Sequence, residues 1–152
     1  MTTEHNDIPD IFKNVAPREN SEAEELQQRA QAVIHSLAES YLDNVHTQIH
    51  DLKRGIQEAR ALSGEERVAT VKNQIFKPAH DMKGQGTTFG YPVLTALGAH
   101  ICALIRSGKM CDESMLNAFE ADVADMETVI KFPAYSENEI LAGIRKRLEE
   151  NA

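Results

Sequence analysis

The stretch SYLDNVHTQIHDLKRGIQEARALS, residues 40–63, carries apolar side chains at intervals of three and four residues. This spacing places them on one face of an α-helix. The same stripe extends back to residue 26, so one helix of about 40 residues is predicted from Ser21 onward, roughly 60 Å long at 1.5 Å per residue. The stripe comprises Leu26, Ala30, Val33, Leu37, Tyr41, Val45, Ile49, Leu52, Ile56, Ala59 and Leu62.

Four more helices are predicted after this one, each from the same apolar spacing and from the turn residues at its ends. Gly90 ends the second helix, and Pro92 opens the third, which stops at Ser107-Gly108. Asp112 is a candidate N-cap for the fourth. The predicted ranges are 63–89, 92–106, 112–131 and about 137–150. Since no segment reads as a strand, the predicted fold class is all-α.

Three capping boxes of the form Ser-x-x-Glu support helix starts along the chain. In a capping box the serine side chain accepts a backbone N–H of the first turn, while the glutamate reaches back to the serine N–H. Apolar residues at helical spacing follow each match. The pairs are Ser21 with Glu24, Ser63 with Glu66, and Ser136 with Glu139.

The order and length of these helices predict the domain organisation. Helices joined by short loops pack antiparallel, so residues 21–131, with a core at about 40–131, predict an up-down four-helix bundle. Residues 1–20 form an N-terminal arm whose apolar cluster, Ile8, Ile11 and Phe12, could dock on the body. The first predicted helix extends beyond the neighbouring helix at residues 21–40, and the apolar face of this part needs another partner. We expect the C-terminal helix, within residues 132–152, to pack on them, and a second protomer is the rival.

The composition narrows the class of protein. A formal charge of −8 argues against general nucleic-acid binding, which requires basic patches. Aromatic content of 5% without tryptophan favours an aliphatic core of packed helices. The chain has no signal-peptide pattern and no uninterrupted apolar run of membrane-spanning length. We therefore expect a cytoplasmic protein without membrane contact, whose two cysteines stay reduced.

The segment AHDMKGQGTTFG, residues 79–90, combines a histidine with glycines inside a predicted helix. At about 100° per residue, Gly84 lies opposite the core, and Lys77 and His80 lie within roughly 40° of it. Asn73 and Thr87 lie toward the same side, and Lys83 sits at the boundary. A mid-helix glycine costs roughly 0.5–1 kcal/mol relative to alanine. An exposed glycine beside an exposed histidine therefore predicts a bare surface that a large partner can approach.

The chemistry of these residues suits phosphoryl transfer. A neutral imidazole nitrogen is a nucleophile near neutral pH, and a lysine three residues later is its neighbour on the helix. Residues 67–83 are basic in an acidic chain, because only Asp81 opposes four cations, Arg67, Lys72, Lys77 and Lys83. The patch is suited to an acidic site on a partner.

The pattern His80-x-x-Lys83-Gly84 closely resembles the phosphorylation motif of histidine phosphotransfer (HPt) domains, in which His-x-x-Lys-Gly sits on a helix of a four-helix bundle. The continuation through Phe89-Gly90 and into a helix containing Gly98 is also similar. The likeness is detailed over residues 76–105 and architectural over about 40–131.

This resemblance implies that His80 is the phosphoacceptor, that Lys83 stabilises the phosphoryl group, and that Gly84 leaves room for a receiver-domain aspartate. Lys72, Lys77, Asn73 and Thr87 are the expected partner-binding residues. Many HPt domains have a polar residue on the following helix that bonds the active histidine. Counting forward from the motif, the corresponding position is near Cys102, whose thiol is a poor substitute for that polar residue. We therefore expect His100, Thr87 or water to orient His80. Gln85 replaces the small residue common after Lys-Gly.

The expected function is that of a phosphoryl carrier in two-component signal transduction. His80 would become phosphohistidine by taking a phosphoryl group from a receiver domain of a response regulator or hybrid histidine kinase, then pass it on in a multistep phosphorelay. No ATP-site motif is present, so kinase activity is not expected. Cofactors are expected only as Mg²⁺ in the partner receiver. We expect a monomer rather than a homodimer. The alternative is a non-transferring adaptor or dimerisation module that binds receiver domains.

Other features have structural interpretations. Pro78 predicts a kink just before His80, because proline removes a helical hydrogen bond. Gly98 predicts a close helix contact, and His100 predicts a structural histidine. His46 and His50 share a helix face with Asp43, but no converging ligands appear elsewhere, so no metal site is predicted.

Overall fold

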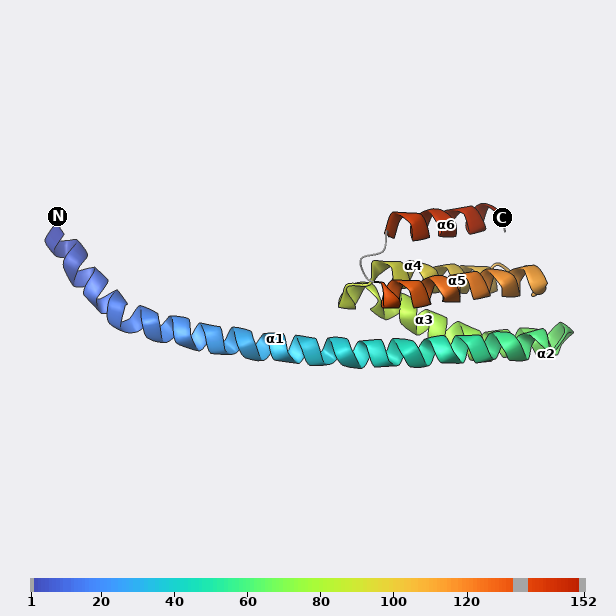
Figure 1. Cartoon of the computed structure of the whole chain (residues 1–152), viewed down its shortest axis with the longest axis horizontal. Coiled ribbons are helices and arrows are strands. Elements are labelled where there is room, and N and C mark those ends of the chain that lie inside the picture. The colour runs from blue at the N-terminus through green and yellow to red at the C-terminus, as the bar shows by residue number, and fades with distance from the viewer. Residues whose placement is uncertain (1, 133–136, 151–152) are drawn as a thin grey trace. The chain divides into compact units, whose positions relative to one another are not determined.

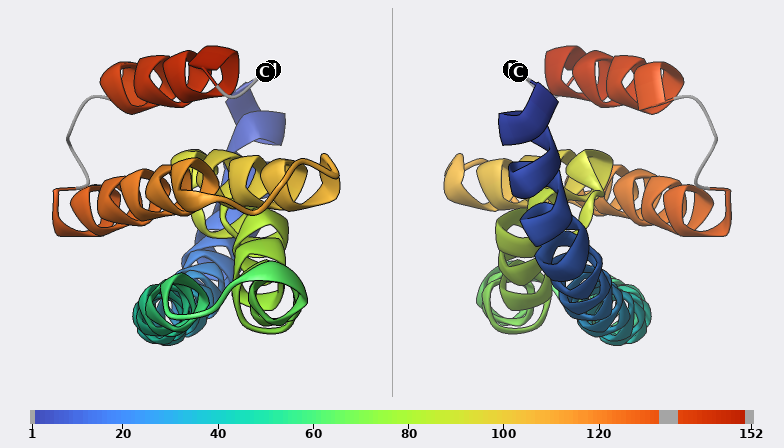
Figure 2. Two further views of the ribbon diagram at one scale, coloured as in Figure 1. Left: turned by 90° about the vertical axis from the view of Figure 1, so that its right-hand side faces the viewer. Right: turned by 90° about the vertical axis from the view of Figure 1, so that its left-hand side faces the viewer.

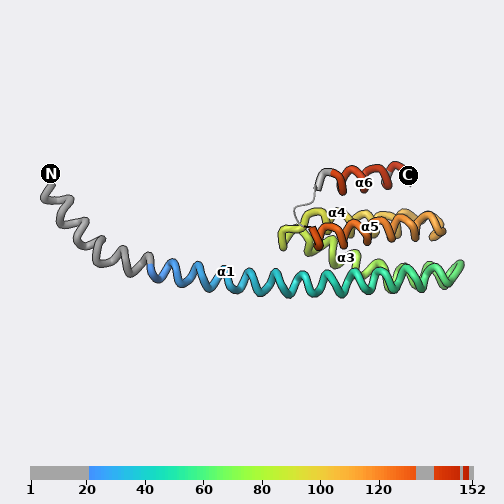
Figure 3. Tube along the Cα trace, in the orientation of Figure 1, coloured from blue at the N-terminus to red at the C-terminus, as the bar shows by residue number. Residues whose placement is uncertain are grey.

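The computed structural model describes residues 2–132 and 137–150, together with their side chains except those of residues 2–20, 137, 138 and 148 (Figure 3). The chain divides into two compact units, which we call unit 1 (Met1–Ser40) and unit 2 (Tyr41–Ala152). Across the described residues every regular element is helical and none is a strand, which confirms the all-α prediction. None of the described helices has the length and apolar character needed to cross a membrane.

The first helix, α1 (Thr2–Arg60), is longer than predicted. Ser21 lies inside it, so the Ser21/Glu24 pair does not mark a helix start. Serine is only mildly unfavourable in a helix, and the Glu, Gln, Ala, Leu and Arg residues that follow it are strong helix formers. The predicted apolar cluster Ile8, Ile11 and Phe12 lies outside the described side chains.

Unit 2 holds the hydrophobic core, which begins at Tyr41 on α1. The apolar stripe of α1 is buried from Tyr41 to Ala59, as its spacing predicted. The remaining elements follow in chain order (Figure 1): α2 (Gly64–Thr70), the π-helical turn η1 (Val71–Ile75), α3 (Phe76–Gln85), the 3₁₀ turn η2 (Thr87–Phe89), α4 (Pro92–Arg106), α5 (Glu113–Lys131) and α6 (Glu137–Glu150).

The predicted second helix is therefore a series of shorter helical pieces. The irregular part is η1, in which the N–H of Phe76 bonds the carbonyl of Val71, five residues back. Pro78 follows three residues after the end of η1. It offers no N–H to the carbonyl of Gln74, and its ring needs room beside that carbonyl. A wider turn, a common form of helix irregularity, thus lies upstream of Pro78, and the kink before His80 stays a prediction.

Several helix ends follow local sequence chemistry. Gly90 terminates the second segment in the left-handed region, at φ 87°, and Pro92 is the first residue of α4. Asp112 caps α5 by accepting a hydrogen bond from the backbone N–H of Met115 at 3.0 Å. Ser63 precedes α2, but its side chain makes no capping hydrogen bond. Ser136 lies outside the described residues.

Helix α6 packs on α4 and α5 (Figures 1 and 2). Its Ile140 and Ile144 are buried in the core of unit 2. Arg147 donates from Nε to Asp122 at 2.9 Å and from a terminal nitrogen to Asp125 at 2.6 Å, and both carboxylates belong to α5. The buried face of α6 is thus used within unit 2. A buried carboxylate on α5 that needs a cation explains this choice. Packing of the C-terminal helix on residues 21–40 stays a prediction.

Candidate functional site

His80 lies on α3 with its side chain 56% exposed. Its ring stacks on the ring of Phe76, one turn earlier, with centroids 5.6 Å apart and planes inclined by 29°. Nδ1 lies 3.9 Å from a carboxylate oxygen of Asp81, which is longer than a hydrogen bond but close enough for electrostatic attraction. The imidazole is therefore supported on one side and open to solvent on the other.

Gly84, one turn beyond His80, is exposed and leaves the surface bare. A Cβ placed on it would meet no heavy atom of the described residues within 4 Å. The glycine therefore serves no packing purpose inside unit 2. Lys83 is exposed next to it. His80, Lys83 and Gly84 are thus all exposed, and their role as a binding surface stays a prediction.

The inner side of α3 is held tightly against α4. Ala79 and Met82 are fully buried there. Gly98 of α4 faces this backbone so closely that a Cβ would lie 2.6 Å from the carbonyl oxygen of Ala79 and 2.8 Å from the amide nitrogen of Lys83. The predicted close helix contact at Gly98 is thus present. It lies directly behind the segment that carries His80 and Lys83, and it keeps that segment in place.

Phe76 adjoins His80, and Arg106 in turn adjoins Phe76. Phe76 is four residues before His80, a spacing that makes neighbours on a helix. Arg106, at the end of α4, places its guanidinium 5.2 Å from the Phe76 ring centroid, a cation–π distance. The i,i+4 spacing could have revealed Phe76. Arg106 is 30 residues away in sequence, and only the packing of α4 on α3 brings it here.

The residues expected to orient His80 are occupied elsewhere. His100 is buried, and its Nδ1 lies 2.5 Å from Asp122. Thr87 bonds Thr95 of α4 through its amide, at 2.8 Å, and through its hydroxyl, at 3.1 Å. No hydrogen bond joins either of these described residues to His80, and orientation by water stays a prediction. The structure instead supports the His80 ring with Phe76 and places Asp81 near Nδ1.

Cys102 of α4 is buried in the core of unit 2. Burial raises the pKa of its thiol, and the positive charges of Lys83 and Arg106 oppose that rise. Both cations therefore act electrostatically on Cys102. Among the residues expected to bind a partner, Lys72 and Asn73 on η1 and Lys77 on α3 are exposed.

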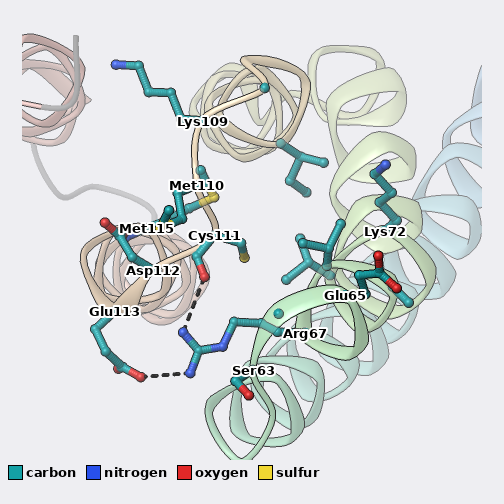
Figure 4. A pocket seen from close by; sticks show the side chains of 16 residues that line it. Ser63, Glu65, Arg67, Lys72, Lys109, Met110, Cys111, Asp112, Glu113 and Met115 are labelled. Atoms are coloured by element: carbon teal, nitrogen blue, oxygen red, sulfur yellow. Dashed lines mark hydrogen bonds and ion pairs between the residues drawn. The ribbon is translucent and has the colours of Figure 1, made fainter.

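A cavity of about 990 Å³ lies away from His80, between α2, η1 and the connection from α4 to α5 (Figure 4). Arg67 crosses its rim and donates to the carbonyl of Cys111 at 3.2 Å and to Glu113 at 3.1 Å. Of the predicted site residues, only Lys72 lines this cavity. His80, Lys83 and Gly84 thus lie outside this cavity.

Among the described side chains, no three His, Cys, Asp or Glu residues are grouped closely enough to hold a metal ion. Comparison of this chain with protein-family models, with curated proteins and with solved structures gives no significant match.

Proposed function

We propose that this protein is a histidine phosphotransfer protein, with α1 from Tyr41, α3, α4 and α5 forming the up-down four-helix bundle of that class. The observation that carries the proposal is an exposed His80 with Lys83 beside it and open space over Gly84. The exposed cations Lys72 and Lys77 near this site match the acidic active site of a receiver domain.

In the proposed reaction His80 attacks the phosphorus of a receiver phosphoaspartate. The nearby carboxylate of Asp81 favours the tautomer with the proton on Nδ1, so Nε2 carries the reactive lone pair. An N–P bond forms at Nε2 as the P–O bond to the aspartate breaks, and the aspartate leaves as a carboxylate. The proton on Nδ1 stays on the ring, and the reverse reaction delivers the phosphoryl group to another receiver.

The remaining residues position the reaction and stabilise its charge. Phosphoryl transfer depends mainly on alignment and on neutralising the phosphoryl oxygens. Lys83 supplies an ammonium from the same helix face, while the receiver domain supplies Mg²⁺. The Phe76 ring restricts the His80 imidazole by stacking. Gly84 lets the receiver backbone approach, because no side chain stands between the partner and His80.

The decisive experiment incubates the full chain with a ³²P-labelled phosphorylated receiver domain and measures acid-labile label on the chain. We expect transfer to the wild type and none to His80→Gln. The matched control is His46→Gln, which changes another exposed histidine, on α1, and should be labelled like the wild type.

Two outcomes would contradict the proposal. Label that persists in His80→Gln would place the acceptor elsewhere. Stable binding of receivers across a panel without any labelling would favour the alternative of a non-transferring adaptor.

A further inference from the structure

Residues 21–40 of α1 carry large apolar side chains that are more than half exposed. Leu26 is 64% exposed, Val33 58%, Ile34 64% and Leu37 52%. Monomeric soluble proteins rarely leave such a row of aliphatic residues uncovered, and a contiguous exposed patch marks an interaction site. The row lies within unit 1, apart from the core of unit 2.

The spacing of this row specifies the kind of partner. Its apolar positions are Ala23, Leu26, Ala30, Val33 and Leu37, so the steps alternate between three and four residues. A regular 3-4 alternation averages 3.5 residues and is the repeat of a two-helix coiled coil, in which these side chains fit between those of the facing helix. The alanines at alternate positions allow the two backbones to come close. We call these five residues the α1 seam.

We propose that the α1 seam pairs with the seam of a second copy of this chain, forming a two-stranded coiled coil. The proposal goes beyond phosphotransfer and does not depend on it. It also replaces the monomer expectation. Within α6, Ile140 and Ile144 are buried in the core of unit 2, whereas Leu141 is 40% exposed.

The distribution of charge favours a second copy over a partner of opposite charge. Two identical helices carry identical charges, so self-pairing requires acids to lie away from the seam. In the heptad set by the seam, Glu24, Glu25 and Glu39 occupy outer positions. On that outer side, His35 Nε2 lies 3.0 Å from Glu39 Oε1.

The positions that flank the seam include one acidic and one basic residue, so neither sign of charge predominates. They are Glu22, Gln27, Arg29, Ile34 and Ser36. In a parallel in-register pair, a flanking residue that directly precedes a seam alanine lies opposite one residue of the second chain. That residue is five positions later in the sequence. Glu22 then meets Gln27 of the second copy, and Arg29 meets Ile34. No like charges are brought together, and Ile34 adds apolar surface to the seam.

The test measures the mass of the full chain in solution by light scattering across a dilution series. We expect twice the 16.9 kDa of one chain for the wild type. A seam variant, Leu26→Asp with Val33→Asp, should have the mass of one chain. The matched control, Gln28→Asp with Gln31→Asp, adds the same two charges to the outer face and should remain a dimer.

Thermal unfolding should show the same unit 2 transition in all three proteins, because residues 21–40 are not part of its core. A second pair, Leu26→Gln with Val33→Gln, removes apolar surface without adding charge and should also be monomeric. A wild type with the mass of one chain at every concentration would overturn the proposal. So would a seam variant that remains dimeric, or a control that dissociates as the seam variant does.

Discussion

His80 and His100 lie on neighbouring helices, and their surroundings are opposite. The side chain of His80 is 56% exposed, whereas that of His100 is 1% exposed. His100 bonds the fully buried Asp122, which also accepts a hydrogen bond from Arg147. His80 has a stacked ring and a carboxylate at 3.9 Å. The buried histidine therefore belongs to the stability of the fold, and the exposed one is available for chemistry.

Two glycines show the same contrast. Gly98 is required where two helix backbones meet, because a Cβ there would strike the backbone of Ala79 and Lys83. Gly84 has no such neighbour among the described residues, so its missing side chain benefits only a molecule from outside. Substitutions on the inner side should therefore change folding, and substitutions on the outer side should change transfer.

The largest effect on stability is expected when Arg147 is replaced. Arg147→Met leaves the buried Asp122 with His100 alone, and unpairing a buried charge makes the free energy of unfolding fall by about 3 kcal/mol. Urea denaturation measures the change. Arg145→Met, on the exposed side of α6, is the control and should stay within about 0.5 kcal/mol of the wild type. If the two variants were equally stable, the bond between Arg147 and the buried Asp122 would not contribute to the stability of the fold.

The second-largest loss of stability is expected for Gly98→Ala. The added Cβ must push α3 and α4 apart against backbone atoms, and overpacking of this kind lowers the free energy of unfolding by about 1–3 kcal/mol. Denaturant titration gives the value. Because α3 would shift, transfer to His80 should also weaken. A variant as stable as the wild type would show that the helix contact is looser than the structure indicates.

Gly84→Ala should make the fold more stable, whereas Gly98→Ala should make it less stable. Alanine in an exposed helix position raises the free energy of unfolding by about 0.5–1 kcal/mol. The new methyl group faces the incoming partner, and we expect transfer to slow about tenfold, equivalent to roughly 1.4 kcal/mol in the barrier. Label transfer from a phosphorylated receiver measures the rate, with Gln85→Ala as the exposed neighbouring control. Faster or unchanged transfer would contradict the role of the bare surface.

The smallest effect at neutral pH is expected at Tyr41. Burial, with a further contribution from Tyr91, raises the pKa of Tyr41 to about 12 from its ordinary value of 10.0. Its hydroxyl has no hydrogen-bond partner among the described residues, so Tyr41→Phe should change stability by less than about 1 kcal/mol near neutrality.

The pH profile provides the sharper test of Tyr41. A neutral phenol favoured in the folded state contributes stability that is complete below pH about 10 and is lost as the pH rises toward about 12. The unfolding free energy of the wild type should therefore fall across that window. Tyr41→Phe should fall less steeply, and parallel profiles for the two proteins would contradict the burial argument.

Local chemistry in the sequence was sufficient for several features. Gly90 and Pro92 bound a turn because glycine reaches the left-handed region and proline lacks an N–H. Asp112 caps α5 because its carboxylate accepts an early amide. The exposure of His80 and Gly84 follows from helical periodicity alone, since a residue opposite a buried stripe faces solvent.

The tertiary structure decided what depends on residues far apart in the chain. The bond between His100 and Asp122 crosses from α4 to α5, and α6 is drawn to that site by Arg147. Arg106 reaches Phe76 only because α4 packs on α3. Side-chain spacing within one helix shows which face is apolar, but it does not show which other helix covers that face. That choice depends on shape and charge at long range, and it left the seam of α1 exposed.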